Sequence, residues 1–249
     1  MAGALPNGYN INDECGSVHP QHMAELVKKH NADLGIALDG DADRVVLADA
    51  SGKVVDGDGM LYLLGVYGQK DPPVADGIVG TVMSNLGLEL ACRERGIAFE
   101  RSNVGDRYVL EKMYAKSWTL GGETSGHIIQ LDKGTTGDGL LTAVSVLEVM
   151  RSTGRTLAEL VSGLQIYPQS MINVPINGSV PAAILLDDET VINAVREVES
   201  ALDCNGRVVL RPSGTEPLIR VMVEGVDAVQ VEMLVEQLTM AVVSSSAKY

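Results

Sequence analysis

The sequence predicts an α/β fold that consists of a partial α/β domain, a complete α/β domain and a C-terminal α+β domain. Three observations support this prediction. Apolar strands alternate with helices over residues 57–166, as in crossover units around a sheet. Residues 1–56 hold only two or three expected strands, too few for a complete layer. After Tyr167-Pro168 the order changes to strand, helix, two strands and helix, which is typical of a compact α+β unit.

The elements follow from the spacing of apolar residues. Met23, Leu26 and Val27 have helical spacing and predict a helix over residues 20–29. Apolar runs on either side of residues 39–44 predict two strands within residues 32–49, and Ser51-Gly52 predicts a hairpin-type turn. The other expected strands are 53–55, 77–82, 98–102, 118–120, 127–131, 170–174, 207–210 and 218–223, and the other expected helices are 60–67, 86–96, 107–114, 139–151, 157–163, 188–202 and 228–242.

Composition limits the class of protein. A chain of 249 residues with 45% apolar content can bury the cores of two domains. The net charge of −14 argues against nucleic acid and anionic membrane surfaces as partners. The three cysteines form no Cys-x-x-Cys pair, which argues against a zinc site or a disulfide framework and favours a reducing compartment. No apolar run reaches transmembrane length, and the N-terminus lacks a signal-peptide pattern, so we expect a cytoplasmic protein.

The most informative segment is residues 39–44, Asp-Gly-Asp-Ala-Asp-Arg, between two apolar runs. Carboxylates this close repel one another unless a cation neutralises them, and oxygen ligands without Cys or His favour Mg²⁺. An EF-hand loop is excluded, because its Gly and acidic positions are occupied here by Arg44 and Ala50. A solvated acidic turn is the alternative, and the apolar flanks and the adjacent Arg44 make it the weaker one.

A second loop, residues 121–127, has the sequence Gly-Gly-Glu-Thr-Ser-Gly-His between two expected strands. Glu123 and Ser125 offer hydrogen-bonding groups for the hydroxyls of a sugar. His127 can donate to a phosphate or transfer a proton near neutral pH. A simple glycine-rich hairpin turn explains this loop about equally well.

A third loop, residues 211–217, has the sequence Arg-Pro-Ser-Gly-Thr-Glu-Pro, with Arg220 three residues beyond it. An arginine fork, two hydroxyl groups and a glycine N–H make a phosphate nest without a Walker lysine. The alternative is a surface loop rich in Pro and Gly that happens to contain an arginine.

Weaker signals occur elsewhere in the chain. Asp106-Arg107 places a charged pair at a helix start, where Asp106 is equally suited to be a cap. Residues 135–139 precede the long helix and predict capping rather than catalysis. The histidines at positions 19, 22 and 30 show no ligand spacing and are expected at the surface.

Taken together and in this order, the three loops resemble those of the α-D-phosphohexomutase superfamily, and most of all its bacterial members that act on glucosamine phosphates. The matching stretches span nearly the whole chain and form a specific set; they are 10–12, 39–44, 104–109, 121–127, 136–139 and 211–222. The family has four domains around one cleft. The resemblance implies that residues 1–56 are the remainder of domain II with the metal loop, 57–166 a complete phosphohexomutase-type domain III with the sugar-binding loop, and 167–249 domain IV with the phosphate-binding loop.

The resemblance also implies roles for individual residues. The expected Mg²⁺ ligands are Asp39, Asp41 and Asp43. The expected catalytic residues are His127, close to the reacting phosphate, and Arg44. The expected substrate-binding residues are Glu123, Ser125, Arg107, Arg211, Ser213, Gly214, Thr215 and Arg220. The reaction implied is the interconversion of glucosamine 6-phosphate and glucosamine 1-phosphate through a bisphosphate, a step toward UDP-N-acetylglucosamine.

The chain departs from the family pattern in three respects. Ala42 stands where Gly is frequent, and Thr124 stands where Gln is frequent. The larger departure is that no Thr-Gly-Ser-His-x-Pro-like segment, which carries the family's phosphoserine, is present. We therefore expect a chain that begins midway through domain II and is inactive without its partner, the N-terminal phosphoserine domain.

Three alternatives stay open at this point. The first is a phosphomannomutase or phosphoglucomutase, since the preferred hexose phosphate rests on resemblance alone. The second is a non-catalytic module that binds sugar phosphates. The third is a Mg²⁺-dependent phosphatase with Asp39 as nucleophile, which would need a catalytic Lys that the pattern does not supply.

Overall fold

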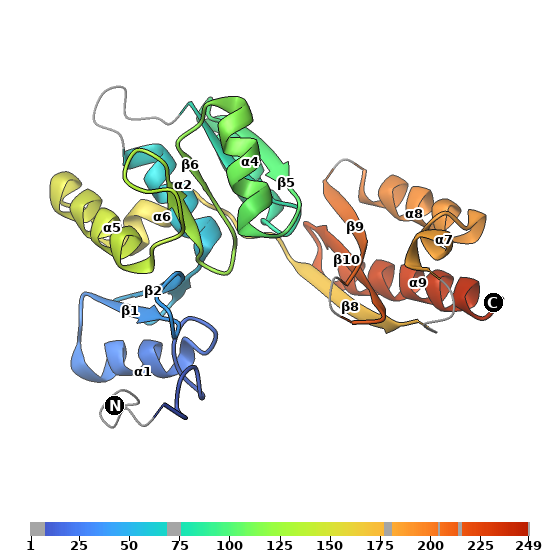
Figure 1. Cartoon of the computed structure of the whole chain (residues 1–249), viewed down its shortest axis with the longest axis horizontal. Helices are drawn as coiled ribbons and strands as arrows, with labels where there is room; N and C mark the ends of the chain where they lie inside the picture. Colours follow the sequence, from blue (N-terminus) through green and yellow to red (C-terminus); the bar gives the residue numbers. More distant parts are fainter. Residues whose placement is uncertain (1–7, 69–75, 177–180, 204, 214–215, 249) are drawn as a thin grey trace. The chain divides into compact units, whose positions relative to one another are not determined.

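The computed structural model describes residues 8–68, 76–176, 181–203, 205–213 and 216–248 (Figure 1). The chain divides into two compact units, Met1–Gln165 and Ile166–Tyr249. No helix in these described ranges is both long enough and apolar enough to span a membrane.

The first unit begins with a small antiparallel sheet of strands β1 (Leu34–Leu38), β2 (Val45–Asp49) and β3 (Val54–Val55). Helix α1 (Gln21–His30) lies against this sheet (Figure 1, blue). A Cβ at Gly35 would lie 2.6 Å from a methyl carbon of Val27, so the absence of a side chain there lets the helix approach the strand. Leu38 pairs with Val45, and residues 39–44 are therefore the connection between β1 and β2.

The second sheet of this unit has the order β5-β4-β6-β7. Its strands are β4 (Gly77–Thr81), β5 (Ala98–Ser102), β6 (Leu120–Gly122) and β7 (Ile128–Gln130). Strand β4 is parallel to β5 and β6, and β7 is antiparallel to β6. Residues 121–127 therefore lead from the carboxyl end of β6 around a tight turn into β7.

Helices cover both faces of this second sheet. They are α2 (Gly57–Tyr67), α3 (Leu86–Glu94), α4 (Asp106–Lys116), α5 (Gly139–Thr153) and α6 (Leu157–Val161). Ile78 and Leu120 are buried in a core with α2, whereas Val79 is buried on the opposite face with Val109 and Met113 of α4. The result is a sheet between two helical layers.

The two sheets of the first unit share one apolar core. Val45, Leu47 and Val55 of the small sheet are buried in the same cluster as Met60 of α2 and Val146 of α5. The small sheet therefore has no separate core on this side. The expected domain boundary between residues 56 and 57 stays a prediction.

The second unit is an antiparallel sheet of order β8-β10-β9 with helices packed on one face. Its strands are β8 (Gln169–Pro175), β9 (Gly206–Pro212) and β10 (Leu218–Gly225), and its helices are α7 (Ala182–Leu186), α8 (Glu189–Leu202) and α9 (Ala228–Ser246). Val174, Ile219 and Val221 alternate along the strands and are buried with Val198 and Leu238 of the helices. Arg211 and Arg220 have the opposite phase and lie on the other face.

The predicted α/β class is confirmed, and two elements differ from expectation. Strand β6 was expected at residues 118–120 and lies at Leu120–Gly122, because Leu120 and Gly121 pair with Ile78 and Val79 of the buried strand β4. Helix α7 was not expected, since its five residues are too few to show helical periodicity.

Candidate functional site

The carboxylates of residues 39–44 converge. One ligand atom from each of Asp39, Asp41 and Asp43 lies within 4.8 Å of the other two, and this is the one such acidic, His or Cys group within the described ranges. The loop curls because Ala42 adopts a left-handed conformation with φ of 60°. The backbone N–H of Arg44 donates to Oδ1 of Asp39 at 3.1 Å and closes the turn.

The charges in this loop are not balanced. The Asp39 side chain is only 6% exposed, and burial, followed by a hydrogen bond with Asp43, raises the pKa of Asp39. The guanidinium of Arg44 is the nearby cation, yet its Nε lies 3.9 Å from Asp39 Oδ2 and 4.0 Å from Asp43 Oδ1. No described residue accepts a hydrogen bond from this buried Nε. Three convergent carboxylates beside one loosely placed arginine fit a divalent cation of the Mg²⁺ type.

The acidic loop and the loop of residues 121–127 lie side by side. The backbone N–H of Val45 donates to the carbonyl oxygen of Gly126 at 3.1 Å. A Cβ at position 126 would lie 2.0 Å from the Val45 carbonyl oxygen, and Gly126 has φ of 94°, so only glycine permits this approach. On the other side, the N–H of Gly57 donates to the Thr124 carbonyl oxygen at 3.0 Å.

His127 connects the two loops directly. Its side chain is 6% exposed, and Nδ1 lies 2.9 Å from Oδ2 of Asp43. Its other ring nitrogen, Nε2, accepts a hydrogen bond from the backbone N–H of Gly137 at 3.2 Å. Both ring nitrogens are therefore engaged within the first unit.

The two expected sugar-binding side chains of this loop differ in environment. Oε1 of Glu123 accepts a hydrogen bond from the backbone N–H of Gly105 at 2.8 Å, which fixes the carboxylate. Ser125 is exposed at the tip of the turn and is free to meet a ligand. The structure thus brings His127 into contact with Asp43 of the carboxylate cluster. Glu123 and Ser125 lie on the same turn as His127, and their place in the site stays a prediction.

A buried acid that the sequence analysis did not select also holds this loop. Asp58, in the first turn of α2, accepts hydrogen bonds from the Asn85 N–H at 2.7 Å and from the Thr124 hydroxyl at 3.2 Å. Burial, followed by the nearby charge of Asp56, raises the pKa of Asp58 to about 7. The segment Asp56-Gly57-Asp58-Gly59, at the expected boundary between residues 56 and 57, has the composition of a turn, and its second Asp was the available signal.

Arg107 lies in the first turn of α4, and its side chain is 78% exposed. Its Nε donates to Glu111 at 2.8 Å, an i,i+4 pair on the helix surface. The structure does not bring Arg107 into contact with the carboxylate cluster, so its expected place in the site stays a prediction.

In the second unit, Arg211 of β9 and Arg220 of β10 are directly opposite each other in the strand register. The Nε atom of each is buried and has no hydrogen-bond partner among the described residues. Burial, followed by the charge of Arg220, lowers the pKa of Arg211. Two adjacent guanidinium groups with unused donors are the arrangement that an anion such as phosphate would stabilise.

The rest of the expected phosphate loop is described in part. The Ser213 N–H donates to the Leu218 carbonyl oxygen at 2.9 Å, and its hydroxyl accepts from the Glu216 N–H at 3.3 Å. Gly214 and Thr215 lie outside the described residues. Asn173 of β8, not selected from the sequence, pairs with Arg220 from the other side, so its amide lies on the same face as both arginines.

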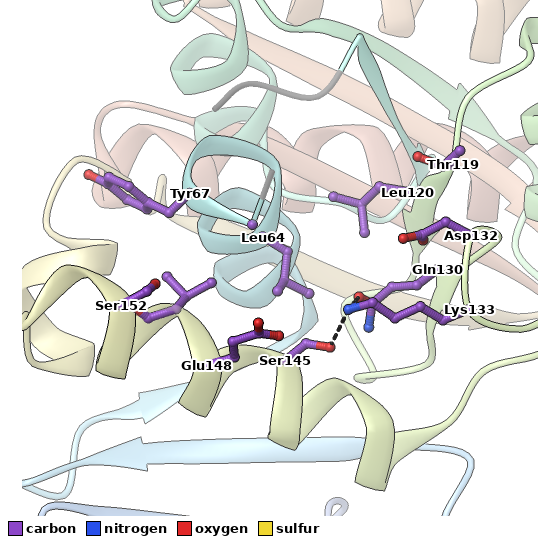
Figure 2. A pocket seen from close by; sticks show the side chains of 12 residues that line it. Leu64, Tyr67, Thr119, Leu120, Gln130, Asp132, Lys133, Ser145, Glu148 and Ser152 are labelled. Carbon is purple, nitrogen blue, oxygen red and sulfur yellow. Dashed lines mark hydrogen bonds between the residues drawn. The ribbon is translucent and has the colours of Figure 1, made fainter. Parts of the chain in front are cut away.

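A separate polar pocket of about 90 Å³ lies in the first unit between α2, β7 and α5 (Figure 2). The Nζ of Lys133 donates to Gln130 Oε1 at 3.1 Å and to Ser145 Oγ at 2.9 Å along its wall. None of the described residues expected in the functional site lines this pocket. It is a small polar cavity of the size that ordered water fills.

Comparison with known protein families assigns both units of the chain to the same family. Residues 10–52 match phosphoglucomutase/phosphomannomutase alpha/beta/alpha domain II, residues 56–167 match alpha/beta/alpha domain III, and residues 171–241 match the C-terminal domain of the same family. These matches are separated by only a few residues and follow the order of domains II, III and the C-terminal domain.

Curated relatives carry one name. The chain is 51% identical over 240 residues to a phosphoglucosamine mutase of Thioalkalivibrio sulfidiphilus, covering 96% of this chain and 53% of that relative. It is 51% identical over 226 residues to a phosphoglucosamine mutase of Legionella pneumophila, covering 91% of this chain and 49% of that relative. The chain spans about half the length of the curated relatives it matches.

Solved structures share the fold. An N-acetylphosphoglucosamine mutase of Aspergillus fumigatus, crystallised with GlcNAc-6P and magnesium, matches with a TM-score of 0.73 at 20% identity, over 96% of this chain and 55% of that one. A phosphoglucomutase/phosphomannomutase family protein of Burkholderia thailandensis matches with a TM-score of 0.71 at 20% identity, over 92% of this chain and 50% of that one. The chain therefore belongs to the phosphoglucomutase/phosphomannomutase family of α-D-phosphohexomutases, with sequence that matches domains II, III and IV.

Proposed function

We propose that this chain provides the metal, sugar and phosphate loops of a phosphoglucosamine mutase, which interconverts glucosamine 6-phosphate and glucosamine 1-phosphate through a bisphosphate. The observation that carries the proposal is the direct attachment of the carboxylate loop to the loop of residues 121–127, through the Asp43–His127 and Val45–Gly126 hydrogen bonds. Relatives that are 51% identical and named phosphoglucosamine mutase favour glucosamine over glucose or mannose. We propose residues 1–56, 57–166 and 167–249 as the three domains concerned.

The metal in this proposal is Mg²⁺, held by Asp39, Asp41 and Asp43, whose oxygen atoms converge. When bound, it would withdraw charge from the phosphoryl group that is transferred. Arg44, beside the same carboxylates, adds a positive charge for the phosphate that approaches them. The carboxylate loop and its arginine thus serve the end of the substrate at which transfer occurs.

The remaining residues bind and orient the sugar phosphate. Glu123 is fixed by Gly105 so that its free oxygen can accept from a sugar hydroxyl, and exposed Ser125 can donate or accept beside it. Arg107 is proposed to contact the sugar phosphate as well, and its exposed ion pair with Glu111 would cost little to break.

The phosphate that is not transferred is assigned to the second unit. Arg211 and Arg220 have unused, buried Nε–H donors that suit it, and Ser213, Gly214 and Thr215 complete the proposed phosphate nest. The bisphosphate has to reorient during the reaction, so that either of its two phosphates can be bound by the carboxylate loop or by the arginine pair. We propose that the working enzyme acts in the cytoplasm and feeds UDP-N-acetylglucosamine synthesis.

The sequence contains no Ser-His segment of the kind that carries the family's phosphoserine. We propose that the phosphoryl donor is a phosphoserine domain that is not part of these 249 residues, and that these residues by themselves convert no substrate. Weak binding without turnover is the expected behaviour of the isolated chain.

The decisive experiment is complementation. The chain is purified alone and mixed with the separately expressed N-terminal half of the Thioalkalivibrio sulfidiphilus relative, and glucosamine 1-phosphate formation is followed. We expect no turnover from either part and measurable turnover from the mixture, lost in the variant Asp41→Asn. Activity of the chain alone at an ordinary enzymatic rate would refute the donor requirement. Faster turnover of glucose or mannose phosphates would instead favour a phosphoglucomutase or phosphomannomutase.

A further inference from the structure

The ring of His127 is held at both ends. Its Nδ1 lies 2.9 Å from Oδ2 of Asp43, and its Nε2 lies 3.2 Å from the backbone nitrogen of Gly137. The residue is 5% exposed, so water does not compete for either nitrogen. Two different segments, the β1–β2 connection and the loop before α5, therefore contact one imidazole.

These partners determine where the imidazole carries its proton. The N–H of Gly137 can only donate, so Nε2 has to present its lone pair and cannot carry a hydrogen. Nδ1 then carries the hydrogen and donates it to the Asp43 carboxylate. The two hydrogen bonds thus define one tautomer of the ring, with the hydrogen on Nδ1.

The Gly137 contact depends on the absence of a side chain. A Cβ at position 137 would lie 2.3 Å from Cε1 of His127. Any other residue would push the peptide away from the ring and break the hydrogen bond to Nε2. Two residues farther, at the first residue of α5, the N–H of Gly139 donates to the Ala42 carbonyl oxygen at 2.8 Å, which joins the same segment to the carboxylate loop.

We propose that His127 is a positioning residue for the metal site, which orients the carboxylate of Asp43 through Nδ1–H while the Gly137 N–H holds the ring in place. This inference rests on the proposed function, because it takes Asp43 as a ligand of the divalent cation. The donor occupies Oδ2 of Asp43 and leaves Oδ1 for the cation. The imidazole orders the carboxylate through this hydrogen bond and is not itself a ligand of the metal. A lysine in this place would compete with the cation.

This role differs from the one that the resemblance implies for His127, namely direct contact with the reacting phosphate. With both nitrogens engaged, the ring has no free nitrogen for a substrate in this arrangement. The loop of residues 135–139 was expected only to cap α5. It also holds the His127 ring through the Gly137 N–H, and this ring in turn orients Asp43.

Two amide substitutions of His127 distinguish the contributions of its two ring nitrogens. In His127→Asn the side-chain nitrogen can take the place of Nδ1 and still donate to Asp43, whereas in His127→Gln the longer amide reaches the place of Nε2. His127→Phe fills the volume without any hydrogen bond. The exposed residue His30 supplies the matched control, His30→Asn.

Binding of Mn²⁺ to the full chain is measured by electron paramagnetic resonance for each variant, with folding checked by circular dichroism. We expect His127→Asn to stay within a few-fold of the unsubstituted chain. We expect His127→Gln and His127→Phe to lose about tenfold or more in Mn²⁺ affinity, the usual range for residues that support metal ligands. His30→Asn should be unchanged.

The tautomer is read independently from the long-range ¹H–¹⁵N spectrum of the imidazoles, in which the chain's four histidines give few signals. We expect a neutral Nδ1–H ring for His127, whose Nδ1 resonance moves when Mg²⁺ is added. An Nε2–H ring, or equal Mn²⁺ affinity for the Asn and Gln variants, would overturn the inference.

The experiment distinguishes this inference from the proposed function. If Asp41→Asn abolishes Mn²⁺ binding but folded His127→Phe binds like the unsubstituted chain, the metal site stands and the role of His127 fails. If the unsubstituted chain binds no Mn²⁺ at all, the proposed metal site fails, and the inference fails with it.

Discussion

The buried carboxylate of Asp58 and the hydroxyl of Thr124 are joined by a hydrogen bond of 3.2 Å, which ties the first turn of α2 to the loop of residues 121–127. Oδ2 of Asp58 is the acceptor, and Oδ1 has no partner among the described residues. A buried carboxylate with one unused oxygen is stabilised when that oxygen carries a proton. The loop that presents Glu123 and Ser125 is therefore supported by an acid that is hard to ionise.

The pH dependence of stability should follow from this acid. Its pKa is raised from 3.8 to about 7, first by burial and then by the charge of Asp56. Between these values the folded chain holds a proton that the unfolded chain has lost, so the free energy of unfolding falls as the pH rises. The loss from Asp58 is complete above pH 7 and amounts to at most about 4 kcal/mol.

Urea denaturation from pH 4.5 to 8 tests this expectation with Asp58→Asn, which cannot ionise. The difference in stability between the variant and the unsubstituted chain should move in favour of the variant as the pH rises. The exposed residue Asp33 provides the control Asp33→Asn, which should show no such trend. If the free energies of unfolding of Asp58→Asn and of the unsubstituted chain differ by the same amount across this pH range, Asp58 is not protonated in the folded chain.

Ala42 should be strained. Its φ of 60° is a conformation that glycine adopts freely and alanine does not. We expect Ala42→Gly to raise the free energy of unfolding by about 0.5–1 kcal/mol, since the relief of strain exceeds the added entropy of the unfolded chain. The neighbouring exposed residue Ala50, which does not have a positive φ, gives the control. Ala50→Gly should lower stability, and equal effects of the two substitutions would count against strain at Ala42.

Removing one carboxylate from the acidic loop should raise the thermal stability of the chain in the absence of metal and reduce the stabilisation that metal gives. In Asp39→Asn, the amide oxygen can keep the hydrogen bond from the Arg44 N–H while repulsion with Asp43 is reduced. We expect a higher melting temperature in EDTA and little further rise in Mg²⁺. The unsubstituted chain should instead gain about 2.7 kcal/mol at a Mg²⁺ concentration 100 times the dissociation constant. Equal Mg²⁺ responses of both proteins would contradict a role of Asp39 as ligand.

The arginine pair of the second unit should likewise oppose stability in the absence of a ligand. Arg211 and Arg220 are cross-strand neighbours of like charge, an arrangement that costs about 0.2–1 kcal/mol. We expect Arg211→Met to unfold at a slightly higher temperature without phosphate and to lose the stabilisation that inorganic phosphate gives. Calorimetric scans with and without phosphate measure both quantities. The exposed Arg196→Met on α8 should change neither.

The elements with strong local signals could be predicted from the sequence. The expected strand at residues 98–102 agrees with β5 at Ala98–Ser102, and the expected helix at residues 139–151 agrees with α5 at Gly139–Thr153. Helix α5 begins where expected, because Asp138 accepts from the Leu141 N–H as its cap. Strand β6 could not be placed correctly, since its position depends on pairing with β4 and not on its own glycines.

The site was predictable as a set of loops but not as a set of contacts. The sequence points to Asp39, Asp41 and Asp43, because they stand at alternate positions of one short segment between two apolar runs. The hydrogen bonds of His127 with Asp43 and with Gly137 join residues 84 and 10 positions apart in the sequence. Such pairings depend on how sheets and helices approach one another, which periodicity does not encode. Asp58 escaped notice for a related reason, since Asp-Gly repeats are the ordinary composition of a turn.

The junction between the β1–β2 connection and its neighbours is built from peptide groups: Val45 to Gly126, Gly57 to Thr124, and Gly139 to Ala42. A main-chain donor or acceptor is the same whichever amino acid carries it. Evolution is therefore free to exchange many of the surrounding side chains without breaking these hydrogen bonds, but not the glycines among them. A Cβ at position 57, 126 or 139 would lie 1.9, 2.0 or 2.6 Å from a carbonyl oxygen, so a survey of homologues should reveal varied neighbours around these three unchanging glycines.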